Sequence, residues 1–156
     1  MAKVRRSYGF PNGIDVSARG RSGGLSLGWK GNSSVSLQSF SVRHIDMVIE
    51  DNETSASWRF TGFYRAPEER HRAAAWDLLR RLSAMNDLPW LVMGDFNEIL
   101  YSFEKEGGLL RNERQMEGFR NALSDCSLED LGYTGCWFTW EKGRMASTTI
   151  RERLDR

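Results

Sequence analysis

The residues best suited to chemistry in this chain are an aspartate and an asparagine that follow a short apolar run. Asp95 and Asn97 come directly after Leu91–Gly94, a run that is typical of a strand buried on both faces. Because side chains alternate along a strand, we expect Asp95 and Asn97 on one face and Phe96 on the other. Strand ends of this kind often carry catalytic groups in layered α/β proteins.

These two side chains together suit the hydrolysis of a phosphodiester. An aspartate can bind a divalent metal or accept a proton from an attacking water. A neighbouring asparagine can donate to a phosphate oxygen without adding negative charge. The alternative is purely structural: an Asx-type turn that closes the strand. A Gly-Asp-x-Asn match alone leaves both interpretations open.

The composition is that of one ordinary globular domain. The chain has 156 residues, of which 40% are hydrophobic and 28% are charged. No stretch approaches the roughly 18 apolar residues that cross a bilayer, and the start lacks the apolar region of a secretory signal. Cys126 and Cys136 have no zinc-site spacing and are expected to be reduced thiols. These features predict an intracellular protein, in the nucleus or cytoplasm, that is not secreted and has no membrane partner.

The charge is unevenly distributed although the net charge is only +1. No global field therefore attracts nucleic acid. Basic residues are concentrated in residues 1–30 and 142–156, and either cluster could contact phosphates. Solvated surface charge explains each cluster equally well. The second cluster contains Lys142, Arg144, Arg151, Arg153 and Arg156.

Periodicity predicts strands first and then helices alternating with strands. Residues 1–22 show no periodicity, and we expect an irregular N-terminal segment followed by one domain over residues 23–156. Alternating apolar residues between residues 25 and 64 predict four strands in an antiparallel meander. Trp58, Phe60, Gly62 and Tyr64 are expected to share one strand face.

Two helices are expected in the second half of the chain. The first begins near Glu68 and Glu69 and ends before Pro89, with its apolar stripe at Ala75, Leu78, Leu79 and Leu82. The second follows Asn112, a candidate N-cap. Since a strand lies between them and alternation returns over residues 138–154, the order predicts a mixed sheet covered by helices.

Four motifs occur in a familiar order: Gly62–Pro67, Gly94–Asn97, Phe138–Trp140 and Arg153–Arg156. On these motifs the chain resembles the endonuclease/exonuclease/phosphatase superfamily, and within it the apurinic-type endonuclease domain of plant LINE-type (non-LTR) retrotransposons. The resemblance covers nearly all of residues 23–156. It implies an α/β (α+β) fold, here an incomplete four-layer sandwich of two stacked mixed β-sheets flanked by helices.

The resemblance also implies an activity, a cofactor and a substrate. The family hydrolyses phosphoester bonds with Mg²⁺ (or Mn²⁺), and its retrotransposon branch nicks target DNA, so DNA is the expected partner. By position, Asp95 resembles the aspartate that orients or deprotonates the attacking water, and it is the expected metal ligand. Asn97 resembles the carboxamide that holds the phosphate.

Two further residues match the family by position. Tyr64 resembles the tyrosine that reaches the scissile phosphate; the alternative is a half-buried strand aromatic. Asp155 resembles the aspartate that braces the catalytic histidine. Its alternative is a salt bridge with Arg153 or Arg151 at a strand end.

Parts of the family pattern are missing from the sequence as given. Family members carry a metal-binding glutamate in an early strand and a histidine in a terminal Ser-Asp-His motif, and His44 and His71 do not occupy that histidine's position. Mg²⁺ prefers about six oxygen ligands, and losing one member of a catalytic set usually costs orders of magnitude in rate. We therefore expect a family fragment, with both ends missing, whose activity is weak or absent.

Three hypotheses remain open on the sequence. The chain is the central part of a metal-dependent phosphodiesterase, a non-enzymatic retroelement remnant that contacts nucleic acid or protein, or a phosphatase of the same fold. The motifs Phe138–Trp140 and Arg153–Arg156 favour the retroelement branch.

Overall fold

The computed structural model describes residues 2–18, 24–31, 34–65 and 72–156. The chain forms two compact units. One unit comprises Met1–Ala66 and Asn86–Gly94, and the other comprises Pro67–Met85 and Asp95–Arg156. Strands and helices alternate in the second half as expected, and the α/β class is confirmed.

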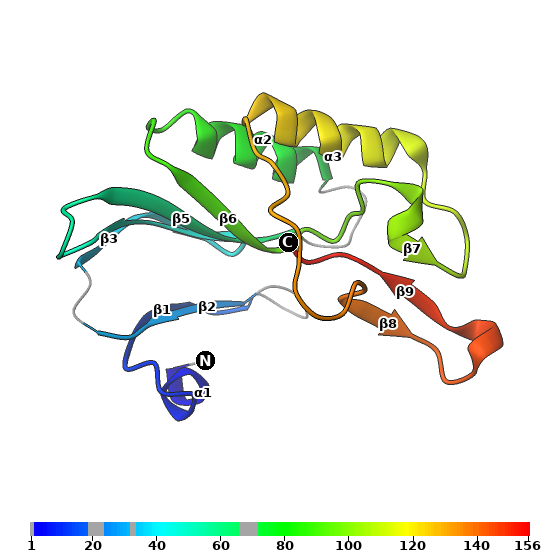
Figure 1. The fold of residues 1–156 in the computed structure, drawn as a ribbon, viewed down its shortest axis with the longest axis horizontal. Coiled ribbons are helices and arrows are strands. Elements are labelled where there is room, and N and C mark those ends of the chain that lie inside the picture. Colours follow the sequence, from blue (N-terminus) through cyan, green and yellow to red (C-terminus); the bar gives the residue numbers. More distant parts are fainter. Residues whose placement is uncertain (1, 19–23, 32–33, 66–71) are drawn as a thin grey trace. The chain divides into compact units, whose positions relative to one another are not determined.

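A four-stranded sheet forms the centre of the first unit (Figure 1). β3 (Ser34–Ser41), β4 (His44–Glu50) and β5 (Ser57–Tyr64) pair as an antiparallel meander. β6 (Trp90–Asp95) lies beside β5 at the edge of this sheet. The strand expected before Asp95 is therefore present.

β6 runs parallel to β5, so the sheet is mixed. The Arg59 amide donates to the Pro89 carbonyl at 2.8 Å, and Gly94 lies against Phe63 further along both strands. Residue numbers therefore increase in the same direction along both strands, which defines a parallel pair. The expectation that β6 is buried on both faces is wrong, because Met93 is 59% exposed on this edge strand.

The N-terminal segment is more ordered than its sequence suggested. α1 (Ala2–Ser7) and β1 (Asn12–Val16) lie within residues 1–22, where an irregular segment was expected. β2 (Leu25–Trp29) pairs antiparallel with β1 and not with β3, so the meander has three strands and not four. Tertiary pairing decides here, because β1 has only five residues and its burial shows no strict alternation.

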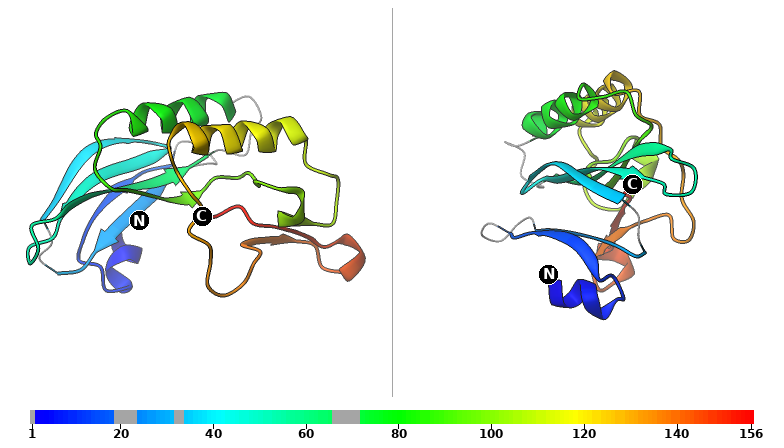
Figure 2. Two further views of the ribbon diagram at one scale, coloured as in Figure 1. Left: turned by 45° about the horizontal axis from the view of Figure 1, so that its top comes forward. Right: turned by 90° about the vertical axis from the view of Figure 1, so that its left-hand side faces the viewer.

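The β1–β2 ribbon forms a second layer in the first unit (Figure 2). Ile45 and Met47 of β4 are each 1% exposed and stand opposite Gly62 and Phe60 of β5. A Cβ added at Gly62 would lie 3.8 Å from Cδ1 of Leu27 in β2. Two stacked sheets therefore enclose this apolar face, as expected.

The other face of the sheet buries an ion pair. Arg59 donates to both carboxylate oxygens of Asp46, at 2.8 and 3.0 Å, and both residues are at most 1% exposed. Thr61 Oγ1 donates to Asp46 at 2.6 Å and accepts from Trp90 Nε1 at 2.8 Å. Residues 58, 60, 62 and 64 do alternate as expected, but the more deeply buried face of β5 is the one with Arg59 and Thr61.

Two helices lie side by side in the second unit (Figure 2). α2 (Arg72–Ser83) and α3 (Glu113–Asp125) pack through the stacked rings of Trp76 and Phe119, whose centroids are 4.6 Å apart. The expected N-cap is confirmed, since the Asn112 side chain accepts from the Arg114 amide. The expected start of the first helix at Glu68 and Glu69 lies outside the described residues.

The second unit also contains a small antiparallel sheet in the order β7 (Lys105–Glu106), β9 (Ile150–Glu152) and β8 (Trp140–Lys142). Short 3₁₀ turns at Ser102–Glu104 and Ala146–Thr148 precede β7 and β9. Within the described ranges, no helix has the length and apolar character that crossing a bilayer requires.

Gly94 should tolerate no side chain. Its φ is +151°, and a Cβ would lie 1.9 Å from the Phe63 carbonyl oxygen. We expect Gly94→Ala to lower the free energy of unfolding by at least about 3 kcal/mol, measured by urea denaturation with tryptophan fluorescence.

The matched control is Gly118→Ala in α3, where a Cβ meets nothing within 4 Å. This variant should be more stable than the wild type by about 0.5–1 kcal/mol. An unchanged midpoint for Gly94→Ala would contradict the close approach of β6 to β5.

Candidate functional site

Asp95 and Asn97 are joined by a turn at the end of β6. Asp95 Oδ1 accepts from the Asn97 amide at 2.9 Å, and Oδ2 accepts from Asn97 Nδ2 at 2.7 Å. Asn97 has φ +49°, a left-handed conformation that asparagine adopts more readily than most residues. The Asx turn that the sequence offered as the structural alternative is therefore present, and it joins the two side chains in place of strand alternation.

Phe96 anchors this turn. The ring is 2% exposed and lies 5.3 Å from the Phe119 ring of α3. Asp95 and Asn97, in contrast, are only half-buried. The turn therefore directs its apolar residue into the core and leaves its polar residues accessible to solvent.

Asp155 lies opposite Asp95. The two residues form an isolated antiparallel β-bridge, and the Phe96 amide donates to the Leu154 carbonyl at 3.0 Å. This bond defines residues 95 and 155 as a non-hydrogen-bonded pair, the closer of the two antiparallel pairings, with Cα atoms about 4.5 Å apart. Three of the four predicted site residues, Asp95, Asn97 and Asp155, are thus brought together.

Tyr64 belongs to the first unit, at the end of β5. Its amide donates to the Arg43 carbonyl at 2.8 Å, and the residue is half-buried. Its participation in one site with Asp95 stays a prediction.

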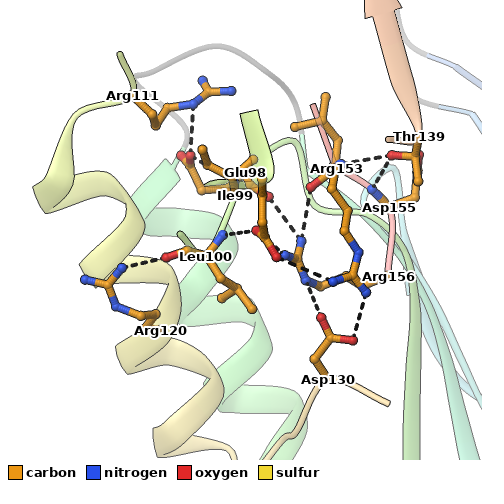
Figure 3. A network of polar contacts seen from close by, with 12 residues as sticks. Glu98, Ile99, Leu100, Arg111, Arg120, Asp130, Thr139, Arg153, Asp155 and Arg156 are labelled. Atoms are coloured by element: carbon orange, nitrogen blue, oxygen red, sulfur yellow. Dashed lines mark hydrogen bonds and ion pairs between the residues drawn. The ribbon is translucent and has the colours of Figure 1, made fainter. Parts of the chain in front are cut away.

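The segment that carries Asp155 is held by two buried arginines (Figure 3). Arg153 and Arg156 both donate to the carboxylate of Asp130, each at 3.0 Å. Both also form ion pairs with Glu104, a carboxylate that is 1% exposed. The suggested salt bridge between Asp155 and Arg153 or Arg151 is not formed, since those arginines pair with other carboxylates.

Glu104 links this segment to the chain that follows Asn97. Its Oε2 accepts from the Leu100 amide at 2.6 Å, and its carbonyl accepts from the Arg153 amide at 3.0 Å. Glu104 was not identified from the sequence, because nothing in its local context distinguishes it from a surface glutamate.

A second set of ion pairs continues this buried network. Arg111 contacts Glu98 at 3.3 Å and Glu152 at 2.9 Å, and Lys105 also pairs with Glu152. Arg151, Arg153 and Arg156 are thus engaged within the protein. Two residues of the basic cluster at residues 142–156, Arg153 and Arg156, therefore have a structural role, whereas Lys142, Arg144 and Arg151 are exposed.

The described residues do not by themselves supply a site for Mg²⁺. The metal prefers about six oxygen ligands, some of them water. No group of three or more His, Cys, Asp or Glu side chains suited to a metal ion occurs in the described part of the chain. Both Asp95 oxygens also accept from Asn97. Weak binding at Asp95 therefore stays a prediction.

The pKa of Asp130 predicts a pH-dependent contribution to stability. Burial raises this pKa, but the Gly132 amide and the guanidinium groups of Arg153 and Arg156 outweigh burial and hold it below its usual value. Because the pKa of this carboxyl is lower in the folded than in the unfolded state, the ionised form stabilises the fold at pH values above the unfolded pKa of about 3.9. This contribution is lost as the pH falls below that value and the carboxyl becomes protonated.

We therefore expect wild type to be more stable than Asp130→Asn at pH 7, with the difference shrinking below about pH 4. Urea denaturation at a series of pH values, from roughly 2.5 to roughly 7 so that the carboxyl titration is covered, measures this difference. A constant difference between the two proteins across that range would contradict the ion pairs of Asp130.

Comparisons with known proteins agree with this geometry. The model of the endonuclease/exonuclease/phosphatase family matches residues 3–154. Among solved structures, the chain is similar to the endonuclease domain of TRAS1, a telomere-specific non-LTR retrotransposon, with a TM-score of 0.71 at 12% identity. The similarity covers 92% of this chain and 64% of that one, so this chain spans less than two thirds of its length.

At such identity the structural likeness shows the fold. No curated protein matches the chain. The family match nevertheless covers residues 3–154, which is almost the whole chain. The chain belongs to the endonuclease/exonuclease/phosphatase family.

Proposed function

We propose that this chain is the core of a nuclease that hydrolyses phosphodiester bonds in DNA. The observation that carries the proposal is the meeting of Asp95, Asn97 and Asp155 at one strand end. Family membership supports the reaction class. The likeness to the TRAS1 endonuclease domain supports DNA as the substrate. Origin from a plant LINE-type element stays a prediction.

Asp95 would act on the attacking water. Two hydrogen bonds from Asn97 orient its carboxylate. An oriented carboxylate can align a water for in-line attack on phosphorus and take up its proton.

Asn97 would stabilise negative charge on the phosphate, and Asp155 would orient a positively charged group. The Asn97 carboxamide would donate to a phosphoryl oxygen, where negative charge grows as the water attacks. Asp155 places a second carboxylate beside Asp95, where it can orient a cationic or protonated partner. A contribution of the Tyr64 hydroxyl at the phosphate stays a prediction.

A divalent metal would neutralise charge on the phosphate. Since the described residues do not form a complete ligand set, we assign no step to it. Whether the 156-residue chain is weakly active or inactive, as the sequence suggested, stays a prediction.

Two other functions remain as alternatives. A non-enzymatic contact surface would bind DNA without cleaving it, and binding would not depend on Asp95. A phosphatase of the same fold would release phosphate from a small substrate and leave plasmid DNA intact.

Plasmid nicking separates these possibilities. We expect wild type to convert supercoiled DNA to the nicked form at most slowly with Mg²⁺, and not at all with EDTA. Asp95→Ala should reduce this rate to the background of the EDTA control, because it removes the group that acts on the water. Gel electrophoresis measures the conversion.

The matched control is Asp77→Ala, which removes a carboxylate from the exposed face of α2, where it pairs with Arg80. Its rate should equal that of wild type. Equal nicking by wild type and Asp95→Ala would refute the assignment of Asp95 and leave the non-enzymatic alternative.

A further inference from the structure

Thr139 occupies the point where the β8–β9 ladder ends. Its amide donates to the Glu152 carbonyl at 3.0 Å, directly beside the pairing of Trp140 with Glu152. β9 ends at Glu152. Beyond this residue, the amides of the Arg-Leu-Asp-Arg segment need other acceptors.

The Thr139 hydroxyl provides that acceptor. Its Oγ1 accepts from the Leu154 amide at 2.9 Å and from the Asp155 amide at 3.1 Å (Figure 3). A hydroxyl oxygen has two lone pairs and can accept both bonds at once. One side-chain oxygen thus takes the place of two backbone carbonyl acceptors of a β-ladder.

The same two residues are held from their other side by the Asp95 turn. The Leu154 carbonyl accepts from the Phe96 amide, and Asp155 lies opposite Asp95. Residues 154–155 therefore lie between the Thr139 hydroxyl and the candidate catalytic strand end. A shift at Thr139 would be transmitted to the spacing of the two carboxylates.

We infer that Thr139 is a positioning residue, whose hydroxyl fixes Asp155 opposite Asp95. This inference rests on the proposed function for its catalytic meaning, although its geometric part can be tested alone. Asp155 is the residue through which Thr139 acts.

Two substitutions at this position separate the effect of the hydroxyl oxygen from that of the branched side-chain shape. Thr139→Val keeps the branched shape but removes the oxygen, whereas Thr139→Ser keeps the oxygen and removes a methyl group. Because Thr139 is exposed, neither change leaves a cavity in the core. Global stability should therefore change little, and a local effect can be distinguished from unfolding.

NMR on the folded protein tests the geometry. In Thr139→Val we expect exchange of the Leu154 and Asp155 amides to accelerate roughly tenfold, the effect of losing one hydrogen bond each. The Hα–Hα cross-peak between Asp95 and Asp155, which a close antiparallel pair gives, should weaken. Thr139→Ser should resemble wild type in both measurements.

Plasmid nicking with Mg²⁺ tests the catalytic meaning. Thr139→Val should lower kcat about tenfold without raising KM, since it displaces a group near the reacting atoms and no group that binds DNA. Thr139→Ser should restore most of the rate. A purely structural role would leave kcat unchanged in the folded variant.

Each outcome decides the inference. Wild-type exchange and an unchanged cross-peak in Thr139→Val would overturn it. Suppose that Asp95→Ala abolishes nicking. Faster amide exchange in Thr139→Val together with an unchanged kcat would then overturn the catalytic part of the inference. If Asp95→Ala nicks like wild type, or neither protein nicks, the proposed function fails while exchange and the cross-peak still decide whether Thr139 positions Asp155.

Discussion

Two buried arginines and the two carboxylates that they share hold the candidate site in place. Arg153 and Arg156 flank Asp155, and both pair with Glu104 and Asp130. Breaking a buried pair from one side leaves an uncompensated charge, which typically costs about 3–5 kcal/mol. The segment opposite Asp95 can therefore shift only if several ion pairs are lost together, and this constraint keeps two like-charged carboxylates side by side.

Aromatic rings complete the enclosure of this network. The Arg153 guanidinium lies 4.7 Å from the centroid of the Trp137 ring and 5.5 Å from that of Tyr133, and Arg156 lies 5.6 Å from that of Phe119. Such contacts favour a desolvated cation. Since Phe119 also packs against Phe96, one ring supports both the ion pairs and the turn that carries the candidate catalytic groups.

The first unit relies on the same kind of interaction. Arg59 and Asp46 are buried together, and Thr61 connects them to Trp90 at the start of β6. β6 is thus tied to β5 by side chains at its start and by the close approach of Gly94 near its end. Bidentate pairs demand one geometry, so they fix the strand that leads to Asp95.

The sequence by itself determined the local features: the strand before Asp95, both helices with the Asn112 cap, and the family motifs. These depend on periodicity and on residue types whose preferences act over a few positions. Only the tertiary structure decided that β1 pairs with β2, that an Asx turn joins Asp95 to Asn97, and that Glu104 and Thr139 hold the Asp155 segment. The Asx turn is local, and the sequence allowed it without deciding between it and a plain strand end. The other contacts join residues far apart in the chain, and an isolated glutamate or threonine carries no local signal of its distant partner.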